Sequence, residues 1–500
     1  MKQKTFPRVC VIGAAQRTVR KEEGPAPEPL SLWEDVSRKA VADASARGDL
    51  LGAINSVRLM YCESWRYDEP ARRLTERLGI NPAQCYDASI GGHMPQMLVQ
   101  TAGEAILRGE LDVALICSGE AIATVQRLQM AGEVPDWSFP SHAEREYPYT
   151  PNAIESRAGF AGHGAPFPLS TIDNARRAQR GTGYTDYRRE LGELLAGMTE
   201  VAAQNPYAWF RRAQDANTII TPRADNRQIT VPYTKHMVAM WNVDMAAALI
   251  VASDEAANDL GVPDEKRVYL HGWCGAEDPY PIGARPSISS SPAMRAASSE
   301  ALRCAGIGMD DVRHLDLYCC FTSALNLARD ALGVGDRRGD ELTVTGGLPY
   351  SGGPGSCYVM HSLAAMTERL RGDPGSFGMV TGTGMWLNKQ AFGIYNTRPP
   401  ESAPRFPAQE ELQRRLDDLP EFEITADFTG PARVATFTVQ YDRNQVPVDG
   451  VAICDVAEGL RGYARIIDPD VLALAAQGEF VGRSVDLVQG PDCAVVRCNA

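Results

Sequence analysis

The chain contains the same spacing of glycines twice, each time around an apolar segment that is followed by a second, shorter one. In both copies, intervals of 17 and then 10 residues separate three glycines, and an arginine precedes the middle glycine. The glycines are Gly92, Gly109 and Gly119 in the first copy, and Gly355, Gly372 and Gly382 in the second. Such a repeat predicts a duplicated α/β unit. We expect the two helix starts of the duplicated unit to face one shared site.

Length and charge limit the class of protein. A chain of 500 residues is too long for one small domain, since about 100–200 residues per domain is usual. Its composition is 44% hydrophobic, which is enough to bury a large core, and its net charge is −13. No long basic run is present, so a nucleic-acid partner is not expected. A phosphate-bearing ligand stays compatible, because helix amino ends and a few arginines can bind one.

Cysteine usage and hydropathy indicate a cytoplasmic protein. None of the 12 cysteines forms a Cys-x-x-Cys pair, so no metal site is predicted. Several lie inside apolar runs and are interpreted as buried, reduced thiols. The first residues contain no apolar signal core, and no run of about 20 apolar residues predicts a membrane span.

Composition changes along the chain predict several domains. Residues 121–240 hold aromatics, prolines and short helices, and we interpret them as an inserted loop domain that shapes a pocket. A proline-rich linker begins near residue 398, and an alternating strand over 432–441 opens a small β-rich domain. A strand is also predicted over 315–321. The domain boundaries that we expect are 1–120 with 241–260, 121–240, 261–398, 399–420 and 421–500.

Four short motifs accompany the repeat. They are Ser89-Ile90-Gly91-Gly92, Tyr318-Cys319-Cys320-Phe321, the glycine-rich stretch 346–354, and Thr381-Gly382-Thr383-Gly384. With these motifs, residues 5–398 resemble the thiolase superfamily, especially the sterol-carrier-protein type. The resemblance implies a thiolase fold of two βαβαβαββ halves, layered α-β-α-β-α. The tail beyond residue 410 resembles the additional C-terminal domain of a thiolase-like subgroup, for which we expect an OB-like fold.

The resemblance also marks where thiolase chemistry is altered. Thiolases use a cysteine nucleophile, a histidine and a second acid/base. Here Ser89 stands at the nucleophile and Gly353 at the histidine of Gly-His-Pro. The last thiolase motif is Cys-x-Gly, and Thr381-Gly382-Thr383-Gly384 retains glycines there without the cysteine. The sterol-carrier type has His-Asp-Cys-Phe where this chain has Tyr318 and Cys319 before Cys320 and Phe321. The alternative is structural: Ser89 caps the helix, and the cysteines only pack.

The candidate site residues follow from these motifs. The candidate catalytic residues are Ser89, Tyr318, Cys319, Tyr350 and His361. The candidate oxyanion or cofactor-binding residues, through backbone N–H groups, are Gly92, Gly353, Gly382 and Gly384. Tyr350 and His361 are included because both lie near the lost histidine in sequence, although a histidine on a helix surface is an equally good interpretation of His361.

Three functions remain open. The first is an acyl-CoA-processing acyltransferase of the thiolase family in lipid metabolism, although ordinary thiolase activity is disfavoured. The second is a thiolase-fold retro-aldolase that cleaves a β-hydroxyacyl-CoA with Tyr318 or Tyr350. The third is a non-catalytic CoA or acyl-CoA binding protein. In each, CoA or acyl-CoA is a ligand, and no permanently bound cofactor is expected. The family resemblance implies a homodimer, which the appended domain puts in question.

Overall fold

The computed structural model describes residues 6–143 and 151–498, and one large mixed sheet runs through it. Within these residues the sheet has nine strands. They are β1 (Val9–Thr18), β2 (Ser56–Leu59), β3 (Gln84–Asp87), β4 (Val113–Ala121), β5 (Asp244–Ser253), β6 (Val268–Glu277), β7 (Val312–Asp316), β8 (Phe377–Gly384) and β9 (Lys389–Asn396).

The order of the strands confirms the duplication. Outward from the middle, the first half runs β1, β5, β4, β2 and β3, and the second runs β6, β9, β8 and β7. In both halves the last two strands in sequence form an antiparallel pair. The halves join where β1 and β6 pair at Cys10–Tyr269 and Val11–Val268. Among the described residues, the second half has no counterpart of β3 in this sheet.

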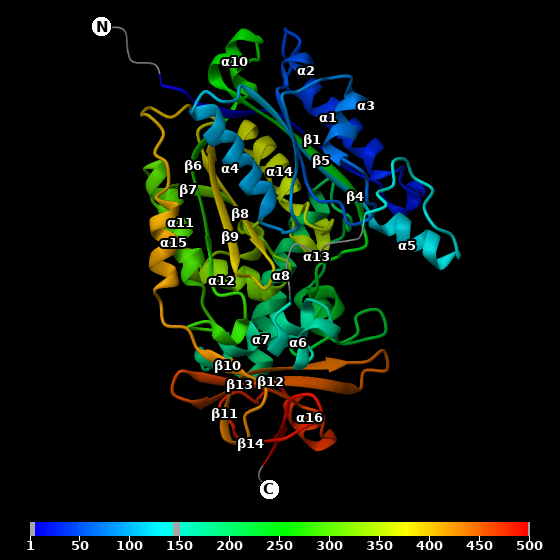
Figure 1. The fold of residues 1–500 in the computed structure, drawn as a ribbon, viewed down its shortest axis with the longest axis vertical. Coiled ribbons are helices and arrows are strands. Elements are labelled where there is room, and N and C mark those ends of the chain that lie inside the picture. Colours follow the sequence, from blue (N-terminus) through cyan, green and yellow to red (C-terminus); the bar gives the residue numbers. More distant parts are fainter. Residues whose placement is uncertain (1–5, 144–150, 499–500) are drawn as a thin grey trace.

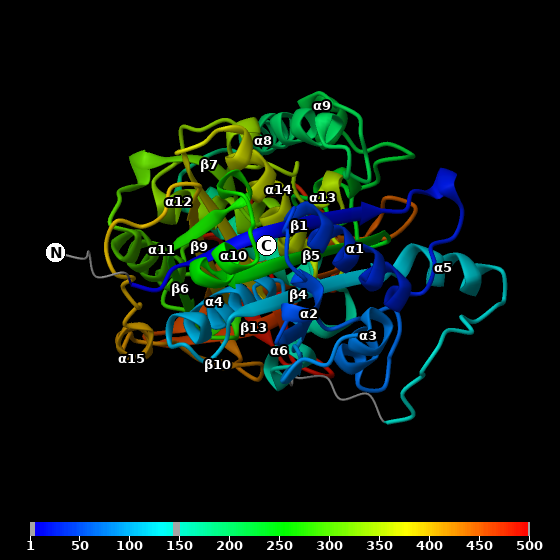
Figure 2. The same ribbon diagram turned by 90° about the horizontal axis from the view of Figure 1, so that it is seen from above.

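Helices cover and separate the two halves, which gives five layers (Figure 1). Helices α4 (Met94–Leu107) and α14 (Tyr358–Gly372) are the central layer, because both contact strands of both halves. Helix α1 (Pro29–Asp43) covers β1, β5 and β4, and α11 (Pro292–Ala305) covers β6 and β9. Figure 2 shows β1 and β5 crossing the middle of the molecule. The thiolase fold is therefore confirmed.

The remaining helices of the two halves are short or peripheral. They are α2 (Leu50–Ala53), α3 (Pro70–Leu78), α10 (Asp254–Asp259), α12 (Thr322–Leu332) and α13 (Leu348–Ser351). Residues 121–240 contain α5 (Ile122–Met130), α6 (Ala153–Arg157), α7 (Pro166–Gln179), α8 (Tyr184–Gln204) and α9 (Ala216–Ile220).

Helix α4 begins later than the sequence suggests. Its first residue is Met94 and its cap position is His93, so the interpretation of Ser89 as the helix cap is wrong. Pro95 explains the difference, since proline favours the first turn of a helix and the backbone before it is restricted. The four residues from Ser89 to Gly92 are therefore an irregular approach to the helix.

The strand predicted over 315–321 is wrong in its second part, because β7 ends at Asp316. The buried Asp316 carboxylate accepts hydrogen bonds from the backbone N–H groups of Val344 and Thr345 at 2.9 and 3.1 Å. Beyond it, the chain leaves the ladder, and the Tyr318 N–H donates to Thr381 Oγ1 at 2.9 Å. This irregular segment directs Tyr318 towards the start of α4.

The C-terminal residues form a closed β-barrel below the thiolase halves (Figure 1). Its strands run in the order β10, β13, β12, β11, β14 and β15, and an additional parallel pairing of β15 with β13 closes it. Their bounds are β10 (Glu423–Thr425), β11 (Gly430–Tyr441), β12 (Pro447–Ala457), β13 (Leu460–Arg465), β14 (Ser484–Val488) and β15 (Ala494–Arg497), with α16 (Pro469–Ala475) after β13. The linker forms α15 (Gln409–Asp417), which packs on β6 and α11.

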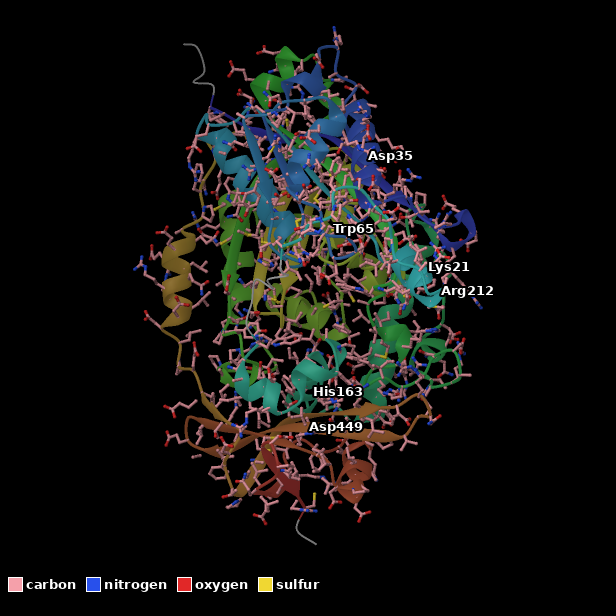
Figure 3. The ribbon with its side chains drawn as sticks, turned by 45° about the vertical axis from the view of Figure 1, so that its right-hand side comes forward. Lys21, Asp35, Trp65, His163, Arg212 and Asp449 are labelled. Carbon is pink, nitrogen blue, oxygen red and sulfur yellow. The ribbon has the colours of Figure 1, made fainter. Side chains whose placement is uncertain are left out.

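Helix α7 joins the barrel to the rest of the molecule through buried polar contacts. Asn174 Nδ2 donates to the carbonyl oxygens of Val231 and Phe437, both at 2.9 Å. Nearer the start of the helix, His163 Nε2 lies 2.7 Å from Asp449 Oδ2, and Figure 3 shows the two side chains meeting at the junction. Since buried polar groups are costly without partners, these contacts fix the barrel in place.

Two negative findings apply to the residues that the structure describes. None of their helices has the length and apolarity that crossing a bilayer requires. Their cysteines are all free thiols, and no group of three or more potential metal ligands comes together.

Candidate functional site

The starts of α4 and α14 meet at one cavity of about 400 Å³. Gly91 and Gly92 line it from the first repeat, and Gly355 and Ser356 from the second. Most of the other lining groups are apolar. They are Ile90, Ala165, Pro166, Leu169, Val238, Ala239, Trp241, Phe321, Leu348, Met385, Trp386 and Leu387. No lysine, arginine, histidine or carboxylate is among the described residues of the lining, so the cavity suits an uncharged group.

The hydroxyl of Tyr318 lies directly against Gly92. It is 2.3 Å from the position that a Cβ on Gly92 would take, and the carbonyl oxygen of Thr383 is 2.6 Å from the same point. Only glycine therefore fits here. The hydrogen bonds of the described part of the chain include none from the Tyr318 hydroxyl or the Gly92 N–H. Both residues line the cavity.

The Tyr318 phenol is a donor and not a base. Burial raises its pKa well above the usual 10 of tyrosine, and the nearby Cys320 and Cys319 thiols act in the same direction. The phenol keeps its proton at neutral pH, so it can donate to a carbonyl oxygen. A carbonyl that becomes an enolate would be stabilised by such a donor.

The turn before α4 packs tightly on the end of β8. A Cβ on Gly384 would lie 2.4 Å from His93 Nδ1, and a Cβ on Gly382 would lie 2.9 Å from the Cα of His93. The backbone of His93 therefore occupies the space that a side chain at Gly382 would need.

The thiols near the cavity are not activated. Cys320 lines it, but burial raises the pKa of its thiol to about 12. Burial also raises the pKa of the Cys319 and Cys357 thiols well above the usual 9, and the neighbouring Cys320 thiol and the Glu120 carboxyl respectively add to the rise. Since the thiolate is the nucleophile, none of them is suited to form an acyl-enzyme.

The structure brings only some of the predicted site residues together. Tyr318, Gly92, Gly353 and Gly384 line the cavity. Ser89 is exposed and is not part of the lining, since α4 begins five residues after it. Gly382 packs behind the lining, on His93.

Cys319, Tyr350 and His361 are buried away from the cavity surface. His361 Nδ1 lies 3.0 Å from Gln16 Oε1 on β1, and burial lowers the pKa of its imidazole to about 3. Tyr350 belongs to the core cluster beneath α8, and its hydroxyl has no partner among the described residues. The structure thus gives these three side chains no route to a ligand in the cavity.

Glu120 is a buried carboxylate that the sequence did not reveal. It accepts hydrogen bonds from the N–H groups of Glu63 and Ser64 at 2.7 and 2.8 Å, and from Ser64 Oγ at 2.6 Å. Its Oε1 also lies 2.8 Å from the Cβ position of Gly355, which lines the cavity. Burial raises its pKa from 4.5 to about 7. Glu120 therefore supports the loop at the start of α14.

Ser356 and His93 were not predicted as site residues, although the repeat gives them equivalent positions at the starts of its two helices. Gly92 and Gly355 are equivalent in the two copies, so the residues that follow them are equivalent too. Ser356 Oγ accepts a hydrogen bond from the Gly91 N–H at 2.9 Å and so ties the two helix starts together. Trp241, which is 47% exposed at the cavity, carries no such signal.

Comparison with known proteins agrees with this fold and site. A model of the thiolase-like protein type 1 additional C-terminal domain matches residues 411–490. A monomeric SCP2-thiolase like protein type 1 from Mycobacterium smegmatis is 31% identical, with a TM-score of 0.85 over 98% of this chain and 99% of that one. The class that the fold defines is thus that of the thiolase-fold proteins. More specifically, this chain belongs to the SCP2-thiolase-like protein type 1 family.

More distant similarities cover the thiolase part. A 3-ketoacyl-CoA thiolase of Aliivibrio fischeri is 27% identical over 139 residues, which are 28% of this chain and a third of that relative's length (33%). The Ltp2-ChsH2(DUF35) aldolase is 17% identical, with a TM-score of 0.60 over 79% of this chain and 99% of that one, and so shows the fold alone.

The contact between Gly92 and Tyr318 can be tested by adding one methyl group. We expect Gly92→Ala to lower the free energy of unfolding by about 1–3 kcal/mol, because the new Cβ must displace Tyr318 or Thr383. Gly372→Ala at the end of α14 is the matched control, because no atom lies within 4 Å of its Cβ position. Urea denaturation of both variants measures the difference. Equal stability of the two variants would show that the contact is not tight.

The buried Glu120 predicts a dependence of stability on pH. Because its pKa is raised in the folded state, its contribution is fully present below about pH 4.5 and is lost as the pH rises through 7. Relative to Glu120→Gln, the wild type should lose about 3 kcal/mol over this window. The control is Glu133→Gln at an exposed carboxylate. Parallel stability curves for wild type and Glu120→Gln, measured by urea denaturation at several pH values, would contradict the prediction.

Proposed function

We propose that this protein binds an acyl thioester of CoA, with the acyl end in the cavity and the thioester carbonyl between the Tyr318 hydroxyl and the Gly92 N–H. The observation that carries the proposal is that Tyr318 and Gly92, whose hydroxyl and N–H make no hydrogen bond among the described residues, lie against each other in the lining of a cavity without charged side chains. A thioester is neutral and has one strong acceptor, which such donors in an uncharged cavity can orient. The oligomeric state is not part of the proposal, and the homodimer stays a prediction.

Ordinary thiolase chemistry is not part of this proposal. Acyl transfer in that mechanism needs a thiolate, whereas the thiols here are buried and protonated. It also needs a histidine in contact with the substrate, but Gly353 lines the cavity at the matching position. Ser89 is exposed outside the cavity, and Ser356, whose hydroxyl belongs to the lining residues, accepts a hydrogen bond from the Gly91 N–H. We therefore expect negligible thiolysis of acetoacetyl-CoA by CoA.

A second candidate is carbon–carbon cleavage of a β-hydroxyacyl-CoA. The specific observation in its favour is that Tyr318 is a protonated donor beside the helix amino end, an arrangement that would stabilise the enolate left by cleavage. This reaction forms no acyl-enzyme, so the lack of a thiolate is no obstacle. Cleavage moves a proton from the β-hydroxyl group and returns one to the α carbon, releasing an aldehyde or ketone.

Calorimetry with acyl-CoA tests the proposal. We expect butyryl-CoA to bind wild-type protein and to bind Tyr318→Phe about 5- to 150-fold more weakly, because a carbonyl left without its donor costs about 1–3 kcal/mol. Tyr350→Phe is the matched control, since Tyr350 is also a buried tyrosine but lies outside the cavity lining.

The same proteins can be assayed for release of an aldehyde or ketone from a β-hydroxyacyl-CoA. Equal affinity of wild type and Tyr318→Phe for butyryl-CoA would contradict the position given to the thioester carbonyl. Robust thiolysis that Ser89→Ala abolishes would overturn the proposal as a whole.

A further inference from the structure

The lining of the cavity changes from exposed to buried side chains. Trp241 is 47% exposed and marks the mouth, whereas Leu169, Phe321 and Leu387 are at most 4% exposed and form a closed end. These three residues belong to one packed cluster of the core, and Tyr318 belongs to another. The cavity therefore lies between the two clusters, with the phenol on one side and an apolar wall of three residues on the other.

Buried polar contacts behind the apolar wall hold it in place. The ring of Phe321 stacks on that of Tyr233, with 5.6 Å between the two centroids. The Tyr233 hydroxyl donates to Asp173 Oδ2 at 2.8 Å, and Thr322 Oγ1 donates to the same oxygen at 2.5 Å. All three of these polar residues are fully buried, so a displacement of Phe321 would break hydrogen bonds to a carboxylate that has no access to water. The closed end of the cavity thus has a fixed depth.

The turn between β8 and β9 completes the wall with strained backbone. Met385 and Leu387 have φ angles of +54° and +60°, although this region of backbone conformation favours glycine. Gln390 Nε2 donates to the Leu387 carbonyl oxygen at 2.7 Å, and Arg285 Nη2 donates to that of Trp386 at 2.6 Å. Met385, Trp386 and Leu387 all line the cavity. The turn therefore keeps a strained conformation together with the side chains that bound the cavity.

The volume of the cavity limits the acyl group that it can enclose. If each acyl carbon takes about the 30 Å³ that one water molecule occupies in the liquid, the cavity of about 400 Å³ holds about 13 carbons. The thioester and the start of the pantetheine arm take part of this space near the mouth, which leaves room for about 8 to 10 carbons. A butyryl chain would leave most of the apolar space without contacts.

We propose that the acyl group taken by this site is a medium-length chain of about 8 to 10 carbons, enclosed by Leu169, Phe321 and Leu387. The inference rests on the proposed function and adds to it the class of acyl group. Each methylene group that the lining takes out of water strengthens binding by about fourfold at most. A longer chain must displace Phe321 or turn back towards the mouth, so its added carbons bring no further affinity.

Calorimetry with straight-chain acyl-CoA thioesters from butyryl to tetradecanoyl, below the concentrations at which they form micelles, tests the class. We expect the affinity of the wild-type protein to rise about two- to fourfold with each added methylene group up to octanoyl-CoA, and to level off between decanoyl- and dodecanoyl-CoA. Equal affinities for butyryl- and octanoyl-CoA would contradict the inference. A rise that continues to tetradecanoyl-CoA would contradict it too.

Two substitutions in the wall should change the limit in opposite directions. Leu387→Gly removes a side chain and relieves the strained backbone, so the affinity should level off at chains that are longer by about two to four carbons. Leu169→Phe fills part of the closed end, so it should weaken octanoyl-CoA binding about tenfold or more and change butyryl-CoA binding less than about threefold. Gln445→Gly is the matched control, since Gln445 also has a positive φ, of +66°, but is exposed in the barrel.

The outcomes separate the acyl class from the proposed function. Variants that bind butyryl-CoA normally and show the same dependence on chain length as the wild type would overturn the acyl class and leave the proposed function standing. Leu169→Phe decides alone if Leu387→Gly does not fold. Absence of binding of every thioester by the wild type would overturn both.

Discussion

The amino end of α4 lies so close to the end of β8 that no side chain fits between them. Gly92 meets the Tyr318 hydroxyl and the Thr383 carbonyl, while Gly382 and Gly384 meet the backbone and ring of His93. This contact joins the two halves of the duplicated fold, because α4 belongs to the first half and β8 to the second. The cavity, the two donors and the position of His93 all follow from it.

The same contact explains how the thiolase fold persists without thiolase side chains. At Gly382 the backbone of His93 takes the space that a side chain would need. Ser89, which the resemblance aligns with the first cysteine, lies outside the cavity. The cavity keeps the Tyr318 phenol, the hydroxyls of Ser356 and Thr383 and a protonated thiol, and it holds no charged side chain among the described residues. The barrel, fixed through α7, contributes no described residue to the lining of the cavity.

The sequence predicted the fold more fully than the site. Of the repeated glycines, Gly92 and Gly355 line the cavity, as do the motif glycines Gly353 and Gly384. Tyr350 and His361 were misleading, because position along a helix does not tell which face is buried. The positions of Glu120 and Trp241 could not be predicted, because they depend on contacts between segments that are distant in the sequence. His93 and Ser356 were predictable in part. The repeat gives them equivalent positions in its two copies, but it does not predict which residues they contact.

The position of the thioester carbonyl is the central claim, and a crystal structure with a non-reactive ketone analogue of butyryl-CoA tests it most directly. The account predicts the ketone oxygen at about 3 Å from both Tyr318 Oη and the Gly92 nitrogen, with the alkyl chain against Phe321 and Leu348. An analogue whose ketone lies at Ser89, or whose alkyl chain lies outside the cavity, would contradict it.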